Sequence, residues 1–360
     1  MVGLAVMPGI AAAGETWTYT GTAGDRLTID GNASSIGPKD ITNVTGNTIT
    51  VNYTSNGSNE VKYFYGGYDN SNKTVSDNTV NLSSGIVNND ECGGTSYKGH
   101  VTNNKATISN GTVQGDVYGG SNYSDGNVTG NTVEIGGGSV EGTVYGGSAI
   151  GSAGVSVSNN RVTISGGTML NGVYGASTNN SGVTSTGNSV TINEDNALVT
   201  VGGNVYGSFA NWSSVDGNSV TIGGGTVNGH VYGGYSIHGS ANNNNVTING
   251  GRVSSVFGGA SLDGTASGNR VYISGGTVNQ IVYGGSSRDN TVTGNSVTIS
   301  GGTVNDIVLG GMSTNSDAVG NIVTISGGTI SGSVYGARSL NGNATGNSVI
   351  ISGSPVLTNS

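Results

Sequence analysis

The stretch Gly294-Asn295-Ser296-Val297-Thr298-Ile299-Ser300-Gly301-Gly302-Thr303-Val304, followed by Val308-Leu309-Gly310-Gly311, decides the fold because its pattern recurs along the chain. Each copy is marked by an Asn that follows Gly, Asn or Asp, and successive markers are 25 to 31 residues apart. A unit this short cannot bury a core alone, so each copy must stack on its neighbours. The markers are Asn47, Asn78, Asn104, Asn131, Asn160, Asn188, Asn218, Asn244, Asn269, Asn295, Asn321 and Asn347.

Within each copy, apolar and polar residues alternate. Val297 and Ile299 stand two and four residues after their marker, with Thr298 between them. A period of two predicts a strand with one buried face. A Gly pair then turns the chain, a second short strand carries one apolar residue, and a third carries Val-Tyr or a variant of it. We therefore expect three short strands and three turns in each copy.

These features predict an all-β fold, a single-stranded parallel β-helix (β-solenoid) of about twelve coils of about 26 residues, and we expect it to be right-handed. Coils of this kind stack at ~4.8 Å, which makes an elongated rod. We assign residues 46–360 to the solenoid, open at its C-terminal end, and residues 14–45 to an N-terminal cap. Residues 1–13 have a short apolar run, a Pro and an Ala-rich ending, which suggest the remnant of a signal peptide.

The corner before each first strand has a restricted composition. The residue before the marker is Gly, Asn or Asp in every copy, and these residues enter the left-handed backbone region at the least cost. The marker itself never varies, and stacked Asn amides can bond from coil to coil. We predict a structural ladder that includes Asn131, Asn160, Asn188, Asn218, Asn244, Asn269, Asn295 and Asn321.

Composition narrows the possible functions. The chain has 20 acidic and 11 basic residues and no basic run, which argues against nucleic acid as a partner. Its one cysteine, Cys92, rules out an internal disulfide and a multi-cysteine metal site. Cys92 stands where other copies have Tyr, so we expect a buried small side chain. We expect no metal and no cofactor.

A column of aromatic residues is the candidate ligand site. The Val before each Tyr should point inward, so alternation points the ring outward, where it can contact sugars or other flat ligands. Phe257 and Leu309 replace Tyr in two copies, which favours a structural role in which the rings are half-covered. The candidate residues are Tyr118, Tyr145, Tyr174, Tyr206, Tyr232, Tyr283 and Tyr335.

Catalysis has weaker support. Asp263 and Asp289 share a phase in adjacent copies and resemble the paired carboxylates of glycoside cleavage, but both lie in Gly- and Ser-rich loops where solvated charges are common. His100, His230 and His238 are scattered and form no recurring set with Ser and an acid. We expect no catalytic residues and no enzyme activity.

The repeat Gly-Asn-Ser-Val-Thr-Ile-Ser-Gly-Gly-Thr-Val, with Val-Tyr-Gly-Gly-x-Ser after it, is clearest at residues 217–236 and 268–286. It resembles repeats in passenger domains of bacterial autotransporters, the proteins of type V secretion, and the resemblance covers roughly residues 45–353. The resemblance implies export through the inner membrane, translocation by a C-terminal β-barrel and display at the cell surface. Passenger domains displayed in this way commonly serve adhesion or aggregation, which are virulence functions. Contact with a membrane is then expected only through such a barrel, which these 360 residues do not contain.

The expected function is therefore a non-enzymatic passenger, secreted or displayed at the bacterial outer membrane, that acts as an adhesin or a structural stalk. Its expected partner is a host or bacterial surface receptor or a glycan. Two alternatives stay open: a polysaccharide-active β-helix enzyme, and an extracellular filament protein. The twelfth copy stops before its Val-Tyr strand, so we also expect either that the chain is a fragment or that its open end associates with another copy.

Overall fold

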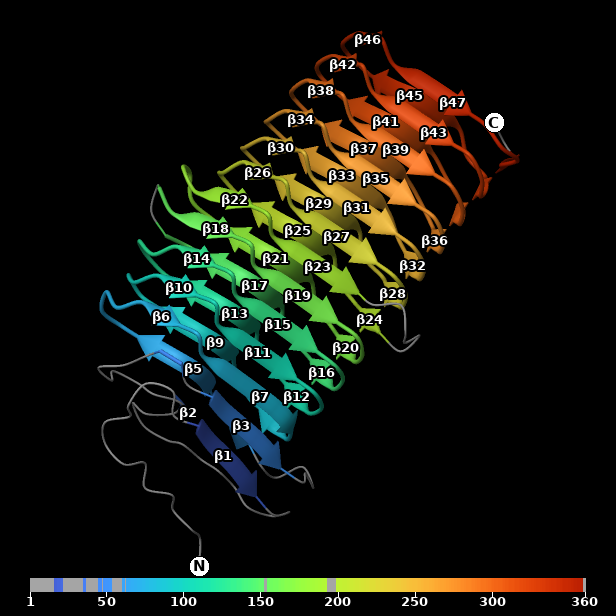
Figure 1. Ribbon diagram of the computed structural model, residues 1–360. Helices are drawn as coiled ribbons and strands as arrows, with labels where there is room; N and C mark the ends of the chain where they lie inside the picture. The colour runs from blue at the N-terminus through green and yellow to red at the C-terminus, as the bar shows by residue number, and fades with distance from the viewer. Residues whose placement is uncertain are drawn as a thin grey trace, which may run out of the picture.

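The computed structural model describes residues 16–21, 35–36, 45–46, 48–53, 60–61, 63–151, 154–192 and 199–358. These residues form an all-β parallel β-solenoid of about 11 turns at a spacing of about 26 residues, without helices. Figure 1 shows the coils stacked in sequence order from the blue N-terminal part to the red C-terminal end. The predicted fold class is confirmed; the expected number of about twelve coils included Asn47, which lies outside the described residues.

The number of strands in each coil differs from the prediction. The strands form four sheets rather than three, and each regular coil contributes one strand to each sheet. The sequence pattern missed a strand of two or three residues that lies just before each marker Asn, such as Val101–Thr102 before Asn104. Such a strand is too short to show a hydrophobic period, so only its pairing with equivalent strands identifies it.

The sheets are numbered in the order in which a coil visits them. Sheet 1 contains β1 (Thr16–Gly21), β3 (Thr48–Tyr53), β7 (Thr79–Ser84), β11 (Lys105–Ile108), β15 (Thr132–Ile135), β19 (Arg161–Ile164), β23 (Ser189–Ile192), β27 (Ser219–Ile222), β31 (Asn245–Ile248), β35 (Arg270–Ile273), β39 (Ser296–Ile299), β43 (Ile322–Ile325) and β47 (Ser348–Ile351). Sheet 2 contains β4 (Glu60–Val61), β8 (Ile86–Val87), β12 (Thr112–Val113), β16 (Ser139–Val140), β20 (Thr168–Met169), β24 (Thr200–Val201), β28 (Thr226–Val227), β32 (Arg252–Val253), β36 (Thr277–Val278), β40 (Thr303–Val304), β44 (Thr329–Ile330) and β48 (Val356–Leu357).

Sheet 3 contains β2 (Ser35–Ile36), β5 (Tyr63–Asp69), β9 (Glu91–Ser96), β13 (Val117–Asn122), β17 (Val144–Ala149), β21 (Val173–Thr178), β25 (Val205–Ala210), β29 (Val231–Ser236), β33 (Val256–Ser261), β37 (Val282–Ser287), β41 (Val308–Ser313) and β45 (Val334–Ser339). Sheet 4 contains β6 (Val75–Ser76), β10 (Val101–Thr102), β14 (Val128–Thr129), β18 (Ser156–Ser158), β22 (Thr184–Thr186), β26 (Val215–Asp216), β30 (Ala241–Asn242), β34 (Ala266–Ser267), β38 (Val292–Thr293), β42 (Ala318–Val319) and β46 (Ala344–Thr345).

The core is one continuous column of aliphatic side chains. The apolar residues two and four positions after the marker point inward from sheet 1, as Val246 and Ile248 do, and both are fully buried. They pack with inward residues of sheets 2 and 3 in a cluster that runs from Phe64 to Ile330. Because every coil repeats the same inward positions, this core grows with the number of coils. Two smaller clusters of buried apolar residues lie apart from it, and the larger contains Val101, Val128, Ala149, Val155, Val157, Ala176 and Val183.

The corner before each marker has the predicted backbone conformation. All twelve residues at this position have positive φ, from 53° to 75°. Four of them carry side chains, namely Asp77, Asn103, Asn159 and Asn243, and the others are Gly. Asn and Asp tolerate this region better than other residues with a side chain, which explains the composition at this position.

The marker Asn residues form a buried ladder along the solenoid. Each described Asn from Asn78 to Asn321 donates its side-chain amide to the Oδ1 of the next marker, at 2.8–3.1 Å, and its backbone N–H to the same atom. The second amide hydrogen of Asn269 goes to the carbonyl of Ala241 in the preceding coil. Each amide therefore ties together two neighbouring coils and the corner beside it.

The Gly pair of sheet 3 makes room for this ladder. A Cβ on Gly120, the second Gly of its pair, would lie 2.5 Å from Cγ of Asn131. A Cβ on Gly119, the first, would lie 2.5 Å from the carbonyl oxygen of Gly146 in the next coil. Both distances are below van der Waals contact, so the pair is needed for close approach of side chain and backbone.

A second ladder runs through the corner between sheets 3 and 4. Ser261 donates its hydroxyl to the carbonyl of Gly239 in the preceding coil and accepts the N–H of Gly264 in its own loop. The Ser residue that ends Val-Tyr-Gly-Gly-x-Ser makes the same pair of bonds in five successive coils, at Ser236, Ser261, Ser287, Ser313 and Ser339. The loops at this corner are therefore fixed to one another.

The two predicted N-terminal segments, residues 1–13 and 14–45, lie largely outside the residues that the structure describes. Residues 1–13 are not described, and of residues 14–45 only β1, β2 and Thr45 are. β1 pairs in parallel with β3, so that Trp17 stands beside Ile49, and β2 pairs with β5. No helix long and apolar enough to cross a membrane occurs among the described residues.

We predict that Asn295→Ala costs ~1 to 3 kcal/mol of folding stability, because it leaves the amide groups of Asn269 and the carbonyl of Ala266 without their buried partner. Asn290→Ala is the control, since its exposed amide bonds only the carbonyl of Asp263. Chemical denaturation of both variants measures the difference. Equal and small losses would show that the ladder contributes little.

We also predict that Gly146→Ala is destabilising by ~1 to 3 kcal/mol, because the added methyl would lie 2.5 Å from the Gly175 carbonyl oxygen and force the coils apart. Gly136→Ala is the matched control: its nearest neighbour would be 3.8 Å away. Thermal unfolding of the two variants should separate them clearly. A similar Tm for both would contradict the close contact.

Candidate functional site

The predicted aromatic column lies on the outer face of sheet 3. Val144 is buried and Tyr145 is half-buried, and the same alternation occurs at Tyr118, Tyr174 and Tyr232, whereas Tyr206 is buried. The structure stacks the rings on one another at 4.7–5.1 Å between centroids, with interplanar angles of 7–26°. The stack contains Tyr118, Tyr145, Tyr174, Tyr206, Tyr232 and Phe257.

This geometry determines what the column can offer to a ligand. Each ring inside the stack has both faces against neighbouring rings, so only ring edges and hydroxyls reach the solvent. A sugar that binds to an aromatic side chain packs against the ring face. The inner rings therefore cannot form a stacking platform, and their contribution is to join successive coils.

The stack changes at its C-terminal side. Tyr283 meets Phe257 edge-on at an interplanar angle of 89°, and Leu309 follows in the next coil. Tyr335, the last candidate residue, is 44% exposed. Tyr283 and Tyr335 are thus outside the parallel stack, and the seven predicted residues do not make one uniform surface.

The column hydroxyls are held in their neutral form. Burial raises the pKa of Tyr174 and Tyr206 to about 12. The Tyr118 hydroxyl donates to Asp116 at 2.9 Å, and burial followed by the charge of Asp116 raises the pKa of that phenol too. The Tyr206 hydroxyl instead accepts a bond from Asn204. These phenols act as hydrogen-bonding groups and not as bases or nucleophiles near neutral pH.

Two further aromatic residues lie beside the column and were not predicted. Phe209 and Tyr235 stack on each other at 5.7 Å, and Phe209 contacts Tyr206 edge-on. Strict alternation from Tyr206 would turn Phe209 inward. It points outward because two successive buried positions, Gly207 and Ser208, shift the alternation by one residue, as the Gly pair does in other strands of sheet 3. Strict alternation alone does not predict this shift.

Asp263 and Asp289 are both bonded by the same cation. Arg288 lies between them, with Nη2 at 2.7 Å from Asp263 and 2.8 Å from Asp289. The hydrogen bond from Arg288 is the main cause of the lowered pKa of Asp289. His238 pairs with the other oxygen of Asp263 and stacks on the ring of Trp212, 3.9 Å away. The cluster is an exposed ion-pair network in the loops after sheet 3.

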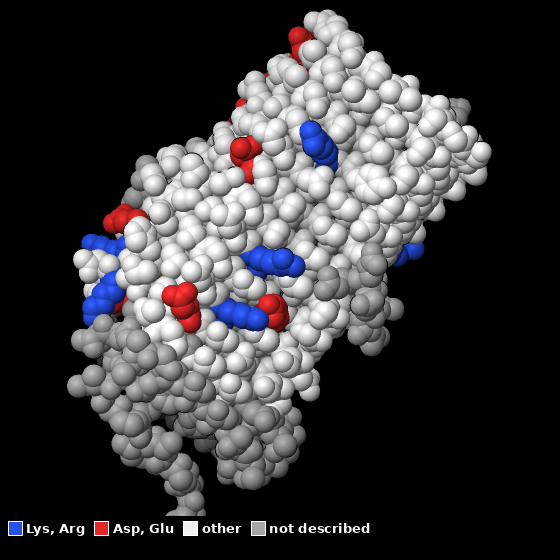
Figure 2. Space-filling model, viewed as in Figure 1, with Lys and Arg blue, Asp and Glu red and all other residues white. Residues whose placement is uncertain are grey.

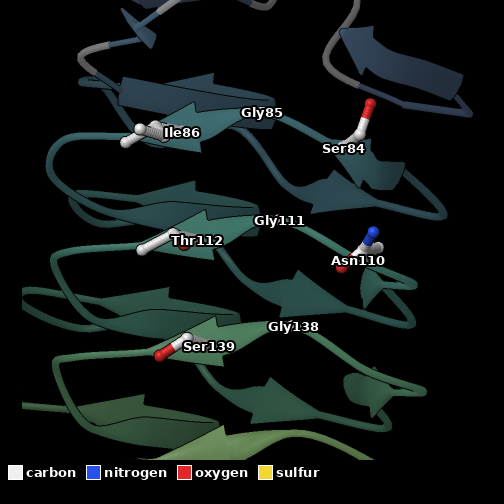
Figure 3. Close-up of a pocket in the computed structure, with 8 residues that line it drawn as sticks. All are labelled: Ser84, Gly85, Ile86, Asn110, Gly111, Thr112, Gly138 and Ser139. Atoms are coloured by element: carbon white, nitrogen blue, oxygen red, sulfur yellow. The ribbon is translucent and has the colours of Figure 1, made fainter. Parts of the chain in front are cut away.

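A shallow groove follows the corner between sheets 1 and 2 over three successive coils. It has a volume of about 350 Å³ and was not predicted. Figure 3 shows two rows of side chains separated by a row of glycines. One row is Ile86, Thr112 and Ser139, the other is Ser84 and Asn110, and the glycines are Gly85, Gly111 and Gly138.

Glu91 is the main departure from the repeat. It takes the inward position of sheet 3 that Phe64 and Val117 take in the coils on either side, and it is completely buried. Neither carboxyl oxygen has a hydrogen-bond partner, and burial raises the pKa of Glu91 well above its ordinary value of 4.5. In the next coil, the first inward position of sheet 1 is Ala106, where the coils on either side have Val. β9 and β11 are in contact, so Ala106 reduces the side-chain volume beside the strand that carries Glu91.

Cys92, next to Glu91, is buried as predicted. Its thiol lies 2.8 Å from the Thr95 hydroxyl, and burial raises its pKa to about 12. A thiol in this state is not reactive. No group of three or more His, Cys, Asp and Glu side chains that could hold a metal occurs in the part of the chain that the structure describes.

Comparison with protein-family models, with curated proteins and with solved structures gives no match for this chain.

We predict that Glu91→Met stabilises the fold at pH 7 by ~1 to 3 kcal/mol, because an apolar side chain of similar length replaces a buried polar group without a partner. The native protein should also lose stability as pH rises. Below pH 4.5 the carboxyl is protonated in both the folded and the unfolded protein, and its contribution to the free energy of unfolding is fully present. As the pH rises from 4.5 to the raised pKa of the folded state, this contribution decreases, and above that pKa it is lost.

Glu91→Gln is the control for the pH effect, since it keeps a polar side chain that cannot ionise. Urea denaturation between pH 4 and pH 9 should show that the free energy of unfolding decreases more steeply with pH in the native protein than in either variant. Parallel curves for all three proteins would mean that Glu91 is not buried.

Proposed function

We propose that this chain is a non-enzymatic β-solenoid passenger of the autotransporter type, secreted or displayed at the bacterial cell surface, where it acts as an adhesin or a structural stalk. The resemblance of its repeats to autotransporter passenger domains is the source of the export and display part of this proposal. Adhesion would use a host or bacterial surface receptor or a glycan as the partner.

The observation that carries the proposal is the uninterrupted column of coil-to-coil contacts. The same Asn bonds link every coil from Asn78 to Asn347, and the aliphatic core runs through the same coils. A solenoid of this kind is a rigid spacer whose side faces stay accessible along its length. That is what a stalk or an extended adhesin requires.

The surface supports contact with uncharged partners. Charged residues make up only 9% of the chain. Figure 2 shows one face that carries few charged side chains, some of them in contact with each other, and wide uncharged areas between them. Long-range electrostatic steering is therefore weak, and adhesion would depend on many short-range polar and apolar contacts.

The enzyme alternative has one specific feature, the pair Asp263 and Asp289, but both carboxylates are engaged by Arg288. A general acid of a glycosidase needs a raised pKa, whereas that of Asp289 is lowered. The filament alternative would instead rest on stacking of one molecule on another.

Binding of labelled protein to bacterial and host cells tests the proposal, with a depolymerisation screen on polysaccharides and negative-stain microscopy run on the same preparation. We expect saturable binding to at least one surface, no release of reducing sugars and single short rods. Cleavage of a polysaccharide would support the enzyme alternative, and long fibres would support the filament. Single rods that bind no surface would leave only the stalk.

A further inference from the structure

The groove at the corner between sheets 1 and 2 has a regular construction. Ile86, Thr112 and Ser139 are paired in register on successive strands of sheet 2, so their side chains form a straight row. The glycine row has positive φ at Gly85, Gly111 and Gly138, which turns the chain without adding side chains to the floor. The result is an open channel parallel to the solenoid axis, to which each of the three coils adds at least one hydroxyl or amide side chain (Figure 3).

The lining excludes several classes of ligand. None of its eight residues is charged, so nothing there would neutralise a phosphate backbone or a charged sugar. Ile86 is its one large apolar side chain, which is too little for a lipid or an apolar peptide. Hydroxyl and amide groups of Thr112, Ser139 and Asn110 supply both donors and acceptors.

A peptide strand is excluded by the backbone. Strand addition needs free N–H and C=O groups at a sheet edge. In the groove, the N–H of Thr112 donates to Gly85 and the N–H of Ser139 donates to Gly111. The Gly138 carbonyl accepts from Thr168 in the following coil. These groups are already used to join the coils.

We propose that this groove binds an extended, uncharged polysaccharide that lies parallel to the solenoid axis. The inference deepens the proposed adhesin function and rests on it. Sugar hydroxyls both donate and accept, which matches the mixture of hydroxyl and amide groups in the two rows. Coils repeat at ~4.8 Å, so a chain that lies along the axis meets Ser84 and Ile86 in one coil, Asn110 and Thr112 in the next, and Ser139 in the third.

The expected affinity of one groove is low, because the site is shallow and its hydrogen bonds replace bonds to water. A polymer with many equivalent segments, bound by many displayed copies, raises the overall avidity without new contacts. The groove thus suits adhesion to a polysaccharide layer better than capture of a small sugar.

Affinity electrophoresis in gels that contain soluble neutral polysaccharides tests the inference. The probes are a β-1,4-linked glucan derivative, xylan and mannan, with heparin as the charged comparison. We expect at least one neutral polymer to retard the protein and heparin not to do so. Thr112→Trp fills the groove and should weaken binding about tenfold or more, a change of ~1.4 kcal/mol.

Thr277→Trp is the matched control, because Thr277 has the same position in sheet 2 of a coil outside the groove. Circular dichroism and thermal unfolding check that both variants fold. Asn110→Ala, at an exposed position of the lining, is a second groove variant if Thr112→Trp does not fold. It should also weaken retardation.

No retardation by any neutral polymer would overturn the inference, as would equal losses in Thr112→Trp and Thr277→Trp. Cell binding without retardation would reject the groove and keep the proposed adhesin function. Retardation without cell binding would keep the groove and reject adhesion to those cells.

Discussion

The hydrogen bonds between marker Asn side chains set the arrangement of the whole solenoid. Each amide bonds the next marker and a carbonyl of the preceding coil, as Asn269 does with Asn295 and Ala241. These bonds are buried, and a shift of one coil relative to the next would leave several polar groups unpaired at once. The coils are therefore held in register, and in the regular strands each residue is paired with the residue at the same position in the next coil.

The register between coils affects function, because equivalent surface residues of successive coils lie beside one another and form columns along the solenoid. A column of Tyr residues uses its ring faces for contacts along the axis, so the inner rings from Tyr145 to Tyr232 have little face left for a ligand. A column of Gly residues has the opposite effect. At Gly85, Gly111 and Gly138 it leaves a channel between two rows of polar side chains. Stacking of equivalent residues therefore covers the ring faces of the aromatic column, and it also creates the groove between sheets 1 and 2.

Residues that depart from the repeat can lower the stability of the solenoid, because the position they occupy is buried between neighbouring coils. Glu91 places a carboxyl without a partner in an otherwise aliphatic column, and the small Ala106 stands on β11 of the next coil, which contacts the strand of Glu91. The contacts of a solenoid are between nearest neighbours, so this cost is local to the coils around Glu91. The regular coils from Val231 to Ile330 contain no comparable interruption of the aliphatic core.

The solenoid, its repeat length, the left-handed corners and the position of the Asn ladder could all be predicted from the amino-acid pattern. These features depend on local backbone preference and on alternation, which are readable in each copy. The two-residue strands of sheet 4, the shift in alternation between Tyr206 and Phe209, and the groove were decided only by the tertiary structure. Each depends on how one coil lies on the next, since a short strand exists only through its pairing and a channel only through the rows that border it.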